Sequence, residues 1–81
     1  MKLKMVRIRN LREDNDLTQT EIAEYLHISQ RTYSRYENDE RAIPIEQLIR
    51  IAEYYKTSLD YLANRTDRKE PYPPSRINRI L

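Results

Sequence analysis

Apolar residues recur at helical spacing through most of residues 4–62, and no strict alternation of apolar and polar residues lasts beyond a few positions. A period near 3.6 is typical of amphipathic helices, whereas a half-buried strand needs a period of two. The chain contains no glycine, so we expect its turns to be made by Asn, Asp, His or Pro. Its 81 residues suffice for one core and leave no room for a second folded domain. The sequence therefore predicts an all-α fold, a compact bundle of five short helices.

Capping residues place the first two helices. The first carries Ile8 and Leu11 inward and is expected to end before the polar pair Asn15-Asp16. The second begins at Thr18-Gln-Thr-Glu21, a capping box in which a hydroxyl and a carboxylate satisfy free backbone N–H groups reciprocally.

Ser29 is a good N-cap for a third helix, so the second and third helices are joined by a turn of about three residues. This spacing is typical of a helix-turn-helix. The segment Asn38-Asp-Glu-Arg41 ends the third helix, and Ser58 caps a short fifth one. Pro44 pre-sets the first turn of the fourth helix, whose inner face we expect to carry Ile45, Leu48, Ile49, Ala52 and Tyr55.

The composition excludes several kinds of site. With no cysteine and one histidine, His27, the chain has no disulfide and no thiolate or imidazole metal site, and we expect no cofactor and no enzymatic activity. The apolar runs are far too short for a membrane span, and the N-terminus is unlike a signal peptide. We therefore expect a cytoplasmic protein without a membrane partner. The net charge of +2 does not by itself predict nucleic-acid binding.

The third helix carries an unusual polar arc. Successive residues of a helix lie about 100° apart, which places Gln30, Arg31, Ser34 and Arg35 on one arc and turns Tyr33 and Tyr36 toward the core. Glutamine can form two hydrogen bonds with adenine and arginine two with guanine, whereas serine can donate to or accept from any base. A solvated face, the alternative interpretation, more typically carries Lys and Glu. The arc therefore predicts reading of base edges.

The segment LTQTEIAEYLHISQRTYSRYEN resembles the helix-turn-helix of the Cro and cI-repressor DNA-binding family, also called Xre-type or lambda-repressor-like. With LREDNDLTQ before it and PIEQLIRIAEYYKTSLDYLANRTD after it, the resemblance covers about residues 7–67. It implies a five-helix bundle whose third helix enters the major groove. His27 and Asp39 stand where this family commonly has glycine, and we expect about one kcal/mol of strain there and the same fold.

The resemblance also implies roles for individual residues. Gln19 is similar to the family glutamine that contacts a phosphate and braces Gln30, although Thr18 is equally explained as an N-cap and Arg41 as an exposed loop residue. Lys2, Lys4, Arg7 and Arg9 are a candidate basic arm. The assignments are DNA base reading by Gln30, Arg31, Ser34 and Arg35, DNA phosphate contacts by Thr18, Gln19, Asn38 and Arg41, and a structural ion pair between Arg12 and Glu37.

We thus expect residues 1–66 to be a helix-turn-helix DNA-binding domain and residues 67–81 a Pro-containing tail. The expected function is that of a sequence-specific transcriptional regulator, a repressor that binds a palindromic operator in double-stranded DNA as a homodimer. Two alternatives stay open: an antitoxin that caps a toxin with its tail, and a protein-interaction adaptor. In the tail, Ile77, Ile80 and Leu81 have helical spacing, which suits a dimer contact or a protein partner as well as a disordered end.

Overall fold

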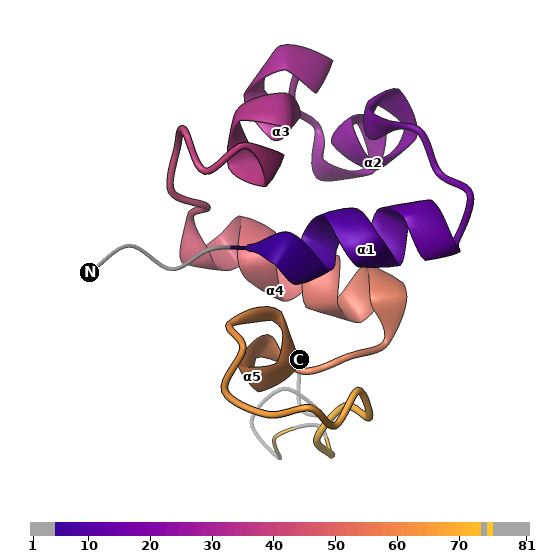
Figure 1. Cartoon of the computed structure of the whole chain (residues 1–81), viewed down its shortest axis with the longest axis vertical. Helices are drawn as coiled ribbons and strands as arrows, with labels where there is room; N and C mark the ends of the chain where they lie inside the picture. Colours follow the sequence, from indigo (N-terminus) through magenta and orange to yellow (C-terminus); the bar gives the residue numbers. More distant parts are fainter. Residues whose placement is uncertain (1–4, 74, 76–81) are drawn as a thin grey trace.

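The computed structural model describes residues 5–73 and residue 75, and all its regular elements are helices. The predicted all-α, five-helix fold is confirmed. In Figure 1, α2 and α3 lie on one side of α1, and α5 lies on the other side. The elements are α1 (Val6–Asp14), α2 (Gln19–Leu26), α3 (Gln30–Glu37), α4 (Ile45–Tyr55) and α5 (Leu59–Leu62).

All five helices contribute to one core. Tyr33 and Tyr36 are buried as predicted, with their ring centroids 6.3 Å apart in an edge-on arrangement. An edge-to-face pair of this kind is favourable beyond the area that it buries. The two tyrosines therefore anchor α3 in the core, and the opposite face of that helix is exposed to solvent. The buried apolar residues are Ile8, Leu11, Ile22, Ala23, Leu26, Tyr33, Tyr36, Leu48, Ile51, Ala52 and Leu62.

The predicted inner face of α4 is wrong at two positions. Ile45 is 57% exposed and Ile49 is 42% exposed, whereas Ile51 is fully buried. At about 100° per residue, the buried arc of α4 is centred between Leu48 and Ile51, which turns Ile45 and Ile49 toward one edge of that arc. An apolar strip on α4 is therefore left outside the bundle.

The same turn closes every helix without glycine. The first or second residue after each helix end adopts a left-handed conformation, and the next N–H donates to the carbonyl five residues earlier, at distances of 2.8 to 3.0 Å. This is the Schellman motif, which usually contains glycine because a Cβ atom is unfavourable at positive φ. The left-handed residues are Asp16, His27, Asp39, Lys56 and Asn64, with φ between 54° and 63°.

Four of these five residues are of the types that the sequence predicts for turns, but Lys56 is not. Its side chain has no short polar group that could stabilise the left-handed conformation locally. The following residues hold it there, because Thr57 and Ser58 are buried and the Thr57 N–H donates to Ala52 O at 2.9 Å. Tertiary packing thus overrides the local preference of lysine.

Replacing Lys56 by glycine is expected to stabilise the fold. Glycine relieves about 1 to 2 kcal/mol of left-handed strain in the folded chain. This exceeds the entropic cost of the greater freedom that glycine gives the unfolded chain, so we expect the free energy of unfolding to rise by about 0.5 to 1 kcal/mol. Urea unfolding measures this change. Lys56→Ala is the matched control, since it removes the side chain and keeps Cβ, and an equal gain from both variants would rule out backbone strain as the cause.

Arg7 is not part of a basic arm, contrary to the expectation. Its guanidinium donates to the carbonyls of Tyr61 (2.8 Å) and Thr66, and it pairs with Asp67 at 2.6 Å. It also lies 4.0 Å from the centroid of the Tyr61 ring. The physical reason is that α5 packs on α1, so acceptors from the far end of the chain surround Arg7. Lys2 and Lys4 lie outside the described residues.

The segment that follows α5 lies against the bundle. The Thr57 hydroxyl donates to Lys69 O at 2.6 Å, and the Tyr72 hydroxyl donates to Asp60 Oδ2 at 2.8 Å. The expected boundary between residues 66 and 67 therefore falls inside a stretch that contacts α1 and α5. The apolar tail positions Ile77, Ile80 and Leu81 lie outside the described residues. Within the described part of the chain, no helix has the length and apolar character needed to cross a membrane.

Candidate nucleic-acid interface

The carboxylate of Glu37 is the most completely buried charge near the third helix, and its side chain has no exposed surface. Arg12 donates to it twice, from Nε to Oε2 at 2.7 Å and from Nη2 to Oε1 at 3.0 Å. The remaining Arg12 nitrogen, Nη1, donates to Leu17 O at 2.9 Å. The structure thus brings together the two residues of the predicted ion pair, at the C-terminal ends of α1 and α3.

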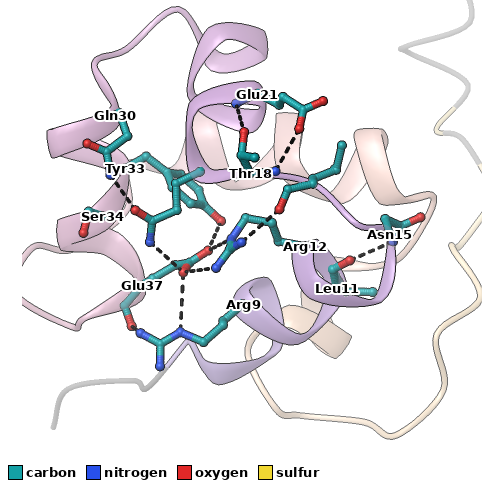
Figure 2. Close-up of polar contacts among 12 residues, drawn as sticks. Arg9, Leu11, Arg12, Asn15, Thr18, Glu21, Gln30, Tyr33, Ser34 and Glu37 are labelled. Carbon is teal, nitrogen blue, oxygen red and sulfur yellow. Dashed lines mark hydrogen bonds and ion pairs between the residues drawn. The ribbon is translucent and has the colours of Figure 1, made fainter.

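Three further side chains donate to the same carboxylate, as Figure 2 shows in part. The Tyr33 hydroxyl lies 2.6 Å from Oε2, Gln19 Nε2 lies 3.0 Å from Oε1, and Arg9 Nε lies 3.4 Å from Oε1. We call Arg9, Arg12, Gln19, Tyr33 and Glu37 the Glu37 cluster. It joins α1, α2 and α3 through one charged group.

Burial and hydrogen bonds in the Glu37 cluster shift the pKa values of Glu37, Arg12 and Tyr33. Burial would raise the pKa of Glu37, but hydrogen bonds from Arg12, Tyr33 and Gln19 outweigh burial and leave the pKa below its ordinary value of 4.5. The hydrogen bond to Glu37 raises the pKa of Arg12, and burial raises that of Tyr33 far above its ordinary value. Because the Glu37 pKa is lower in the folded chain, its stabilisation is fully present above pH 4.5 and is lost as the pH falls through the folded pKa.

The two glutamines near the helix-turn-helix are in direct contact. Gln30 Nε2 donates to Gln19 Oε1 at 2.6 Å, which is the contact between these two residues that the family resemblance implies. Thr18 is exposed and forms the predicted capping box, since its hydroxyl accepts from Glu21 N–H at 3.1 Å and its own N–H donates to Glu21 Oε1 at 2.9 Å. The N-terminus of α2 and the start of α3 therefore share one surface.

The predicted polar arc of α3 lies on the outside of the molecule. Gln30, Arg31 and Arg35 are exposed and Ser34 is half-buried. Within residues 5–73, the side chains of Arg31 and Arg35 have no hydrogen bond and no ion pair, so both guanidinium groups are available to an external acceptor. The arc carries positive charge that the rest of the described fold does not neutralise.

The loop after α3 carries the other two predicted phosphate residues. Asn38 is exposed, and its Oδ1 accepts from Arg9 Nη2 at 3.0 Å while its Nδ2 donates to Ser34 Oγ at 3.4 Å. Arg41 is exposed and has no ion pair in the part of the chain that the structure describes. Arg9 is therefore held by Glu37 and Asn38 and is not a free arm, as α1 packs beside the end of α3.

Sequence reasoning predicted only Arg12 as a partner of Glu37 and did not place Arg9, Gln19 or Tyr33 beside it. Arg9 lies three residues before Arg12 and so shares its helix face, which is a signal that the sequence does contain. The Tyr33 hydroxyl has a weaker signal, because Tyr33 and Glu37 are four residues apart on the same helix. In the described residues, no group of three or more His, Cys, Asp or Glu side chains could hold a metal ion.

Two helices joined by a tight turn, with the second presenting a polar outer arc, form a helix-turn-helix, the motif of a class of DNA-binding proteins. A family model described as helix-turn-helix matches residues 8–62. The chain belongs to this helix-turn-helix family, of the Xre and cI-like type.

The curated relatives are described as HTH-type transcriptional regulators. The chain is 34% identical over 65 residues to the uncharacterized HTH-type transcriptional regulator YobD of Bacillus subtilis (strain 168), a match that covers 80% of this chain and 58% of YobD. It is 32% identical over 63 residues to the HTH-type transcriptional regulator PrpR of Mycobacterium tuberculosis (strain ATCC 25618 / H37Rv), covering 78% of this chain and 13% of PrpR. The chain thus spans less than two thirds of the length of either relative.

Solved structures share the fold. A transcriptional regulator from Listeria innocua is 26% identical, with a TM-score of 0.73 over 99% of this chain and 74% of that one. The P22 c2 repressor, crystallised with synthetic operator 9T in the presence of Tl⁺, is 24% identical, with a TM-score of 0.71 over 82% of this chain and all of that chain. These matches establish the helix-turn-helix fold.

A double-mutant cycle is expected to show strong coupling between Arg12 and Glu37. Arg12→Met leaves a buried carboxylate without its main partner and should cost about 3 to 5 kcal/mol, whereas adding Glu37→Leu should recover part of that loss. Urea unfolding of the two single variants and the double variant at pH 7 measures the coupling. Additive losses would show that the two charges do not depend on each other.

Proposed function

We propose that this chain is a sequence-specific, double-stranded DNA-binding transcriptional regulator whose α3 enters the major groove. The observation that carries the proposal is the exposed arc of α3, in which the guanidinium groups of Arg31 and Arg35 have no partner within the described residues. Arginine and glutamine are the side chains that recognise guanine and adenine bidentately. We assign base reading to Gln30, Arg31, Ser34 and Arg35.

Phosphate contacts on both sides of α3 would set its position in the groove. On one side, the exposed Thr18 and the half-buried Gln19 lie at the N-terminus of α2, where free N–H groups and the helix dipole favour an anion. On the other side, Asn38 and Arg41 are exposed in the loop after α3. Such contacts fix register and orientation, and the base contacts supply specificity.

The proposed regulator acts as a repressor in the cytoplasm and binds a palindromic operator as a homodimer. One recognition helix reads only about 4 to 6 base pairs, so useful specificity needs two half-sites about one helical turn apart. The P22 c2 repressor, which shares this fold, is described in complex with an operator. The exposed Ile45 and Ile49 on α4 and Tyr72 after α5 supply apolar surface that suits a dimer contact.

Arg35→Ala is expected to relax sequence preference at one base pair of each half-site and to weaken specific binding by about 1 to 3 kcal/mol. Selection of DNA from a random duplex library at two salt concentrations, followed by titration of the selected site, measures both effects. Arg68→Ala is the matched control, because it removes the same charge from the exposed segment after α5. If Arg35→Ala weakens binding to selected DNA and to random DNA equally, Arg35 contacts a phosphate and not a base.

Ile49→Glu is expected to weaken pairing of two chains on the selected palindrome without a large change in stability, since Ile49 is 42% exposed. Sedimentation of the protein with palindromic and half-site duplexes measures the stoichiometry. Val6→Glu, which changes another exposed apolar residue at the start of α1, serves as the control. A wild-type chain that stays monomeric on the palindrome would contradict the dimer.

A further inference from the structure

A series of three hydrogen bonds connects the core of the molecule to the first residue of the polar arc. The Tyr33 hydroxyl donates to Glu37 Oε2 at 2.6 Å, Gln19 Nε2 donates to Glu37 Oε1 at 3.0 Å, and Gln30 Nε2 donates to Gln19 Oε1 at 2.6 Å. We call Tyr33, Glu37, Gln19 and Gln30 the glutamine network; in Figure 2 Gln30 lies at one end and Glu37 near the centre. The network begins at a side chain with no exposed surface and ends at an exposed one.

The direction of these hydrogen bonds is imposed from the buried end. An ionised carboxylate only accepts, so Gln19 has to turn its NH₂ group toward Glu37 and its oxygen toward Gln30. Gln30 then has to turn its own NH₂ group toward Gln19. One N–H and the oxygen of the Gln30 amide remain for an external partner, a donor and acceptor pair that fits adenine N7 and N6.

We propose that Tyr33 and Glu37 are positioning residues for base recognition: through Gln19 they hold the Gln30 amide in one orientation and thereby set the base that Gln30 selects. This inference rests on the proposed DNA-binding function. It gives Glu37 a role beyond its ion pair with Arg12, and it gives a role to the hydroxyl of a tyrosine that is fully buried.

The Tyr33 hydroxyl is suited to hold the carboxylate of Glu37. Oε2 receives the two shortest bonds, from Arg12 Nε at 2.7 Å and from Tyr33 at 2.6 Å, and this leaves Oε1 in reach of Gln19. The Tyr33 ring is fully buried and packs edge-on against Tyr36, so its hydroxyl has one available position. Without that hydroxyl, Oε2 keeps only the bond from Arg12, which weakens the restraint on the last torsion of the carboxylate, a soft one.

The protonation of both groups suits this arrangement. Burial and the hydrogen bond to Glu37 raise the pKa of Tyr33 far above its ordinary value, so the hydroxyl keeps its proton and donates at neutral pH. The low pKa of Glu37 keeps the carboxylate ionised and therefore an acceptor only. The direction of the glutamine network is thus the same throughout the neutral pH range.

Tyr33→Phe tests the inference because it removes one oxygen and keeps the ring. Tyr55→Phe is the matched control, since the Tyr55 hydroxyl is buried and has no hydrogen-bond partner among the described residues. In ¹H–¹⁵N spectra of the free protein, we expect Tyr33→Phe to shift the side-chain amide signals of Gln19 and Gln30, and Tyr55→Phe to leave them in place. This measurement needs no DNA.

In DNA selection, we expect Tyr33→Phe to lower the preference for adenine at one position of each half-site by about three- to tenfold, with the other positions unchanged. Gln19→Met interrupts the glutamine network at the surface and should lower the same preference, which provides a second variant should Tyr33→Phe fail to fold. Thermal unfolding followed by circular dichroism checks the fold of each variant.

The outcomes separate the two proposals. A wild-type chain that selects a sequence, together with folded Tyr33→Phe and Gln19→Met variants that select it with equal preference at every position, would overturn the positioning role and leave the proposed function intact. A wild-type chain that selects no sequence would overturn both. A loss confined to one base position, accompanied by shifted Gln30 amide signals, would support the inference.

Discussion

Removing a carboxylate from water costs several kcal/mol unless donors replace its hydration, and the arrangement of the first three helices follows from how Glu37 meets that requirement. Its side chain is fully buried and accepts hydrogen bonds from Arg9 and Arg12 on α1, Gln19 on α2 and Tyr33 on α3. A relative movement of these helices would separate the buried charge from its donors on α1 or α2. The Glu37 cluster thus restricts the packing of α1, α2 and α3 more narrowly than apolar contacts alone would.

The same charge lies close to the outer arc of α3, so the core and the proposed recognition surface are not independent. The cluster ends at Gln19, and Gln19 contacts Gln30 at the start of the arc. Recognition of a base edge requires a side chain that is held in one orientation before it binds, because ordering it on binding costs free energy. Helix α3 has only eight residues, so its length alone gives it little rigidity. Its two buried tyrosines and the hydrogen-bonded carboxylate of Glu37 hold it in place instead.

Much of the fold could be predicted from local signals. Helical periodicity, the capping box at Thr18 and the N-cap at Ser29 correctly predicted five helices, and the arc of α3 followed from its sequence alone. The errors concern contacts between distant segments. Arg7 binds residues 54 to 60 positions away, and Ile45 and Ile49 lie outside because the buried arc of α4 is set by its neighbours. A periodic pattern shows that a helix has an apolar face and does not show where that face is centred.

The sequence by itself determined the helix boundaries, the helix-turn-helix spacing and the side chains offered for base reading, since these depend on residues within a few positions of one another. Only the tertiary structure decided which way those side chains are turned. The Gln30 amide is directed by Gln19 and, through it, by a carboxylate at the far end of α3 and a tyrosine in the core. Hydrogen-bond direction is a property of the assembled network, because each donor is placed by the acceptor that the neighbouring helix brings to it.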